Sequence, residues 1–250
     1  MTGRIKVSLA RRYAPLATDE RPNLFHSLFF VETSDVNRGG AFAKIGSSIE
    51  LSLLRKVNRN SIALRDRMRP DGRFRIYYTR KLSHFVQILD FIPKIIDGRG
   101  KERSPSELKS LEFGDNVQRD CYLAVFNSSL FYWLLTVYFD CRNLNKREVE
   151  SLQFDPQKLD ESEKNKLEGL CRGLMKDIKK NAKMLTMHYK TLGKLQIECT
   201  YPKFSKSLID EIDSFLAKHF ALSMEELDFL VNYDIKYRMG VSDTEDDDGA

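Results

Sequence analysis

The chain of 250 residues has few cysteines, and their spacing argues against two common kinds of site. The four cysteines are widely separated and form no Cys-x-x-Cys pair; they are Cys121, Cys141, Cys171 and Cys199. Neither a zinc site nor a dense disulfide framework is indicated, so reduced thiols of a cytoplasmic protein are the simplest interpretation.

Long hydrophobic runs are also missing. The N-terminal residues lack the continuous apolar segment of a signal peptide, and no uninterrupted run reaches the roughly 18 apolar residues of a membrane-spanning helix. Residues 123–139 come closest, but this run is short and contains Asn127, Ser128 and Ser129. We therefore interpret it as protein core and expect no membrane association.

The glycines form neither a Gly-x-Gly-x-x-Gly motif nor a phosphate-binding P-loop. The sequence Asn-Arg-Gly-Gly at 37–40 is typical of a turn. Ile49, Leu53 and Leu54 then follow at helical spacing, and Ser47 is suited to cap the start of that helix.

Charge is unevenly distributed along the chain. Residues 1–110 hold 22 Lys and Arg against 11 Asp and Glu, a net charge of +11, so the remaining 140 residues carry −6 of the total of +5. A basic segment of this kind favours a polyanionic partner, because neutralised phosphates release counterions. The alternative is a solvated basic face.

The most basic window is 65–81, where Pro70, Asp71 and Gly72 predict a turn. Arginine and tyrosine then alternate with apolar residues over 73–78, which predicts a half-buried strand. Residues 85–96 are apolar, and Pro93 predicts an edge strand or a strand end. A basic loop is expected at 97–105.

The stretch at 121–154 is the best candidate for the spine of the core. Its aromatic run predicts a buried helix, and its character changes at Asp140 to a cluster of planar donors and cations. Such groups bind phosphate oxygens and base edges. A core helix with a solvated cap has the same pattern.

Three motifs in this order carry a resemblance to a known family: residues 127–133, residues 140–147 and residues 233–240. The chain resembles the C-terminal target-recognition region of adenine-specific DNA methyltransferases, especially the type IIG restriction-modification enzymes of bacterial defence. The resemblance covers about residues 10–240. It implies an α+β fold: a DNA target-recognition domain with a mixed sheet and a core helix at 1–155, followed by a helical C-terminal region at 156–240.

The C-terminal part predicts a long helix over 160–189, a short strand over 195–201 and an amphipathic helix over 207–220. Ser223 and Glu226 have the spacing of a capping box for the last helix. Residues 241–250 are acidic and are predicted to be a disordered tail.

No two prolines are adjacent, so the clamp that holds a flipped adenine in this family is missing. We expect no cofactor in this chain, and S-adenosylmethionine on a catalytic partner or a missing N-terminal portion. Two Asp-x-Lys triplets, at Asp177 and Asp234, have the spacing of nuclease motifs. Such triplets are frequent by chance, and no catalytic residue is assigned.

The sequence thus predicts a double-stranded DNA reader that presents adenine to a methyltransferase carried elsewhere. A protein-interaction module that docks a separate methyltransferase or nuclease is the alternative, and a magnesium-dependent nuclease is a third class. Candidate DNA-binding residues, chosen for charge and placement, are Arg73, Arg75, Tyr77, Arg80, Lys81, Arg99, Lys101, Arg103, Arg142, Asn143, Asn145, Lys146 and Arg147.

Overall fold

The computed structural model describes residues 6–9, 30–38, 41–59, 63–66 and 71–240, and the fold is α+β, as predicted. The helices are α1 (Ser48–Asn58), α2 (Asn116–Phe126), α3 (Ser129–Tyr138), α4 (Lys146–Glu150), α5 (Glu161–Lys180), α6 (Lys206–His219), α7 (Met224–Asn232) and α8 (Ile235–Met239). Short 3-10 helices are η2 (Leu64–Asp66), η3 (Pro156–Lys158) and η4 (Pro202–Ser205). The strands are β1 (Lys6–Ser8), β2 (Phe30–Glu32), β3 (Phe74–Tyr78), β4 (Ile88–Leu89), β5 (Ile95–Asp97), β6 (Glu102–Arg103), β7 (Lys109–Phe113), β8 (Lys183–Tyr189) and β9 (Gly193–Cys199).

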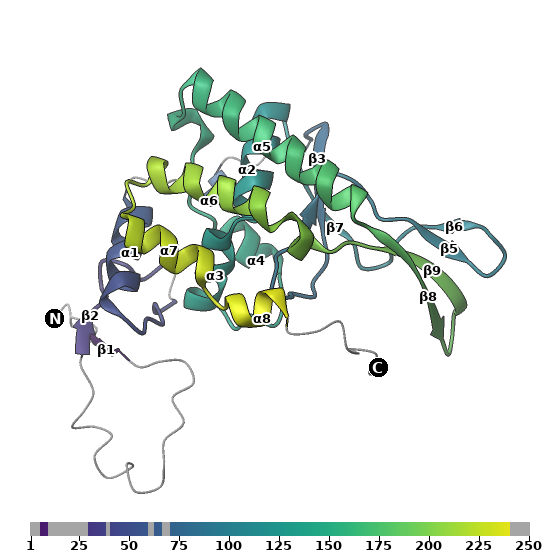
Figure 1. Ribbon diagram of the computed structural model, residues 1–250, viewed down its shortest axis with the longest axis horizontal. Helices are drawn as coiled ribbons and strands as arrows, with labels where there is room; N and C mark the ends of the chain where they lie inside the picture. The colour runs from purple at the N-terminus through teal and green to yellow at the C-terminus, as the bar shows by residue number, and fades with distance from the viewer. Residues whose placement is uncertain (1–5, 10–29, 39–40, 60–62, 67–70, 241–250) are drawn as a thin grey trace, which may run out of the picture.

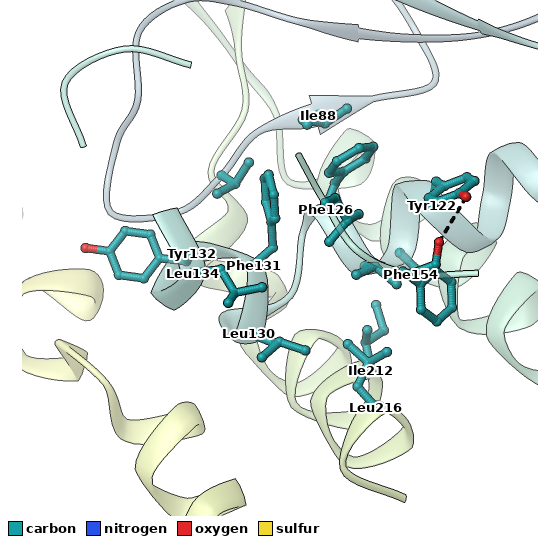
Figure 2. Packing of buried hydrophobic residues seen from close by; sticks show 14 of the residues in the cluster. Ile88, Tyr122, Phe126, Leu130, Phe131, Tyr132, Leu134, Phe154, Ile212 and Leu216 are labelled. Carbon is teal, nitrogen blue, oxygen red and sulfur yellow. Dashed lines mark hydrogen bonds between the residues drawn. The ribbon is translucent and has the colours of Figure 1, made fainter. Parts of the chain in front are cut away.

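The core is built on α2 and α3, and every residue from 120 to 138 is buried. The spine was predicted as one helix; it is two, because the Asn127–Ser128 step ends one and starts the next. The Ser128 side chain accepts a hydrogen bond from the backbone N of Phe131, which caps α3. Figure 2 shows the cluster around this corner, where the Tyr122 hydroxyl donates to the Phe154 carbonyl at 3.0 Å.

No single helix among the described residues is long and apolar enough to span a membrane. The α2 and α3 pair has the length and composition together, but the two helices are bent by 66°.

A three-stranded antiparallel sheet, in the order β4-β3-β7, packs on α2. The alternation predicted for β3 is confirmed: Ile76 and Tyr78 are buried, while Arg75 is exposed. Asn127 fixes this sheet to the helical corner, since its side-chain amide donates to the carbonyls of Ile88 and Leu123 at 2.8 and 2.9 Å. Its Oδ1 also accepts from the backbone N of Ile88 at 3.3 Å.

A second antiparallel sheet, in the order β6-β5-β9-β8, forms an arm that projects from the helical body (Figure 1). The mixed sheet that we expected is not found among the described residues, where all strand pairs are antiparallel. The basic loop predicted at 97–105 contains β6, which pairs with β5 in a hairpin. The segment at 85–96, predicted to be an edge strand or a strand end at Pro93, holds two strands in different sheets: β4 is at the edge of its sheet, β5 is inside its own, and Pro93 lies between them.

The predicted helix over 160–189 is wrong in its second half. Helix α5 ends at Lys180, and Lys183–Tyr189 is a strand that pairs with β9 along its whole length. Leu185, which lies within the predicted helix, is paired with Ile197 in the sheet instead. The long-range pairing overrides the local periodicity. The region at 156–240 is therefore not wholly helical.

The C-terminal helices α6 and α7 cover α3. The predicted capping box of α7 is confirmed, and Glu226 also accepts from Lys56 Nζ at 2.6 Å. Asp213 of α6 is fully buried and accepts hydrogen bonds from the backbone N atoms of Ser129 and Leu130 at 3.1 and 3.2 Å. Burial raises the pKa of Asp213 to about 6, against the effect of these hydrogen bonds.

The domain boundary at residue 155 stays a prediction. The pairing of β5 with β9 and the packing of α2 against α5 are contacts between the two predicted parts. The predicted tail at 241–250 lies outside the described residues, as does most of the N-terminal 29-residue segment.

Candidate nucleic-acid interface

Two of the predicted basic segments meet where β3 ends. Lys81 and Asn143 form an isolated antiparallel bridge, and the backbone N of Leu144 donates to the Arg80 carbonyl at 2.8 Å. Arg80, Lys81 and Arg142 are exposed at this meeting point. We call these four residues, Arg80, Lys81, Arg142 and Asn143, the junction surface.

The loop that carries Arg142 has a defined conformation. The Asp140 carboxylate accepts a hydrogen bond from the backbone N of Arg142 at 3.0 Å, and this bond lowers the pKa of Asp140. Cys141 adopts a positive φ of 58°. The turn thus sets the direction of the chain between α3 and α4 before any ligand binds.

The three predicted residues of α4 and its cap have partners within the protein. The backbone N of Asn145 donates to Glu148 at 2.8 Å. Lys146 Nζ lies 3.3 Å from a carboxylate oxygen of Glu150. Arg147 lies over the ring of Phe139 at 5.4 Å, yet its side chain is 80% exposed. Exposed ion pairs are weak, so Lys146 and Arg147 remain available to an anion.

The β3 face is less free than the sequence suggested. Arg75 is opposite Glu112 of β7, and the two side chains form an ion pair at 2.8 Å. Arg73 is exposed just before the strand, and Tyr77 is half-buried. These residues lie along the strand that leads to Arg80, but the pairing of Arg75 with Glu112 neutralises part of the predicted basic face.

Arg99, Lys101 and Arg103 lie on the β5–β6 hairpin of the arm and are exposed. The Asp97 carboxylate accepts hydrogen bonds from the backbone N atoms of Arg99 and Lys101, both at 3.0 Å, and the bond from Lys101 is the main cause of its lowered pKa. Arg99, Arg103 and Lys194 line a shallow cavity of about 480 Å³ between the two hairpins. The arm thus forms a second basic surface.

A third basic feature, a cleft lined by three arginines, was not predicted from the sequence. Arg38 and Arg65 line a cleft together with Arg147, although the turn at 37–40 and the basic window suggested no link between them. No spacing in the sequence could reveal this, because three distant segments meet only in the fold. We call it the arginine cleft.

The Asp-x-Lys triplets have structural roles. Asp177 accepts hydrogen bonds from the Ser205 hydroxyl at 2.7 Å and the Asn181 amide at 3.1 Å. Asp234 accepts one from the Tyr132 hydroxyl at 3.2 Å. Within the described part of the chain, no group of three or more His, Cys, Asp or Glu side chains is arranged to hold a metal ion.

Comparison with known proteins identified no relative of this chain. No family model matches the chain, and neither a curated protein nor a solved structure is significantly similar to it. The resemblance to the target-recognition region of adenine-specific methyltransferases therefore stays a prediction from its motifs.

Proposed function

We propose that this chain binds double-stranded DNA and reads a specific sequence in it. It would serve as the specificity portion of a cytoplasmic restriction-modification adenine methyltransferase whose catalytic part lies elsewhere. The observation that carries the proposal is the junction surface, in which the bridge between Lys81 and Asn143 brings two basic segments together. The arm adds a second cluster of exposed cations.

The proposed division of labour follows from the chemistry of the side chains. Lysine and arginine on the junction surface contact phosphates and set the register of the duplex. Asn143, at the bridge, has the amide donor and acceptor that match the major-groove edge of adenine. The β5–β6 hairpin, at one edge of the four-stranded sheet of the arm, offers its exposed cations to phosphates. S-adenosylmethionine and the methyl transfer belong to the catalytic partner.

The exposed apolar side chains of the arm favour a second candidate function, the docking of a separate methyltransferase or nuclease subunit. Met184, Tyr189 and Leu192 are 47%, 42% and 52% exposed. Methionine and tyrosine are enriched in protein interfaces. In this reading the cations of the chain contact DNA only within the complex.

The experiment is selection of duplex DNA from a random pool by the purified chain, across a salt series, with sequencing of the bound fraction. Enrichment of one short motif, with affinity that falls steeply as salt rises, is the expected result. Weak binding without enrichment would contradict autonomous reading and favour the docking module. Magnesium-dependent loss of the pool by cleavage would point to the nuclease class instead.

A further inference from the structure

The arginine cleft has a volume of about 460 Å³, within the range of small-molecule sites. Its lining comes from three segments. These are the turn after β2, the chain at η2, and the stretch from the end of α3 through α4 to Gln153. The described lining residues are Arg38, Ala41, Ala63, Arg65, Tyr138, Phe139, Arg147, Glu150, Ser151 and Gln153.

Arg38 is a partly buried cation, and no carboxylate among the described residues forms an ion pair with it. Its guanidinium lies over the ring of Tyr138 at 5.1 Å and donates to the Asn58 side chain, while its Nε has no hydrogen-bond partner. Burial lowers the pKa of Arg38, yet a guanidinium keeps its charge at neutral pH. Removing a charge from water without a counterion costs free energy, so an anion bound beside this partly buried guanidinium would stabilise it.

The other two arginines of the cleft are held by weak contacts. Arg147 lies over Phe139 and is 3.6 Å from Glu148, and Arg65 is 3.8 Å from Asp66. Glu150, the acidic residue of the described lining, is itself paired with Lys146 at 3.3 Å. The cleft therefore keeps an excess of positive charge.

Backbone pairing and one side-chain hydrogen bond also fix the shape of the cleft. Ala63 and Gln153 form an antiparallel bridge, and the backbone N of Leu64 donates to the Leu152 carbonyl at 2.8 Å. The Tyr138 hydroxyl donates to the Val36 carbonyl at 2.6 Å. These contacts fix the segments that carry Arg65 and Arg38, so little ordering is needed when a ligand binds.

We propose that the arginine cleft binds the phosphate group of a nucleotide. Guanidinium groups match phosphate oxygens with paired hydrogen bonds. A second cavity of about 720 Å³ shares Ala41, Tyr138, Phe139 and Arg147 with the cleft and adds Phe42. Phe42 is 56% exposed, and aromatic side chains of this kind stack on bases. The phosphate belongs either to a free nucleotide or to the backbone of bound DNA; only the second source rests on the proposed function.

The test compares the wild-type chain with Arg65→Gln, Arg147→Gln and their double variant. Adenosine monophosphate is titrated by calorimetry, and a fluorescent duplex by anisotropy across a salt series. Arg55 is on α1 and forms an exposed ion pair with Asp35. Arg55→Gln removes this pair and is the matched control. Arg38→Gln is a further variant, but the exposed pair carries the test because Arg38 packs on Tyr138 and bonds Asn58, so its loss also disturbs packing.

We expect Arg65→Gln and Arg147→Gln each to lower the affinity for one of the two probes at least 5-fold. Arg55→Gln should leave both affinities unchanged. Loss of nucleotide binding identifies a free nucleotide as the source. Loss of duplex binding, with a salt slope shallower by about 0.9 for each arginine removed, identifies the DNA backbone. If the double variant binds both probes as the wild type does, or the wild type binds neither, the cleft proposal is overturned.

The two proposals fail in different ways. A wild-type chain that binds the nucleotide but no duplex contradicts the DNA function and supports the cleft. If the double variant still selects one DNA motif at full affinity and the wild type binds no nucleotide, the DNA function is supported and the cleft proposal is contradicted.

Discussion

Lys81 and Asn143 pair as in a single rung of an antiparallel ladder, although one follows β3 and the other follows α3. The pairing explains how a buried aromatic helix controls a surface: α3 fixes the loop, and the loop fixes the end of β3. A change in one basic segment is therefore expected to alter the binding contribution of the other.

The double substitution Lys81→Gln and Arg142→Gln is expected to weaken duplex binding at least 10-fold. It removes two cations of the junction surface, so the slope of log affinity against log salt should fall by about 2. Anisotropy titrations over a salt series measure both quantities. Lys176→Gln with Lys180→Gln, two exposed positions of α5, is the matched control and should change neither. Equal losses in both pairs would mean that only net charge matters.

Asn127→Ala should destabilise the fold by about 3 kcal/mol, since it removes three buried hydrogen bonds: two join Ile88 of β4 to the corner between α2 and α3, and the third bonds the Leu123 carbonyl within α2. Urea unfolding followed by circular dichroism measures the free energy of unfolding. Asn232→Ala removes one exposed hydrogen bond to Asp228 and should cost less than about 0.5 kcal/mol. A similar loss for the two variants would contradict the role given to Asn127.

Two glycine substitutions should have opposite effects. A Cβ at Gly72 would lie 2.3 Å from backbone atoms of Phe113, so Gly72→Ala is expected to cost about 3 kcal/mol or more by forcing β3 away from β7. A Cβ at Gly169 of α5 meets nothing within 4 Å, and Gly169→Ala should stabilise the chain by about 1 kcal/mol through helix propensity. Thermal unfolding of both variants and the wild type gives the comparison.

Asp213 should make stability depend on pH with a defined sign. Its pKa rises from 3.8 to about 6 on folding, so the folded state holds the proton more tightly. The stability that this carboxyl contributes is present below about pH 4 and is lost as pH rises through 6, an effect of about 3 kcal/mol. The free energy of unfolding of the wild type, minus that of Asp213→Asn, should therefore be larger at pH 4 than at pH 7.5. A difference that grows with pH would refute this.

Elements set by local chemistry were predictable from the sequence. The helix after Ser47, the alternation of β3 and the capping box at Ser223 depend on neighbours a few residues away, and the structure has all three. The end of α5 was not predictable in the same way, because Leu185 continues the helical spacing and only its pairing with Ile197 makes it a strand residue.

The candidate sites divide along the same line. Charge and turn signals led to the residues of the junction surface and the arm. The arginine cleft was out of reach, because Arg38, Arg65 and Arg147 meet only through long-range backbone contacts. The ion pair of Arg75 with Glu112 was likewise hidden until the register of β3 and β7 was known.

The buried corner of α2 and α3 also bears on how the chain is made. Helices α5, α6 and α7, which pack against this corner, all follow it in the sequence. During synthesis, the most apolar stretch therefore leaves the ribosome before the helices that cover it. The nascent chain exposes this apolar surface until those helices are made. We expect the nascent chain to depend on chaperones. We also expect a fragment that ends at residue 155 to aggregate under conditions in which the full chain stays in solution.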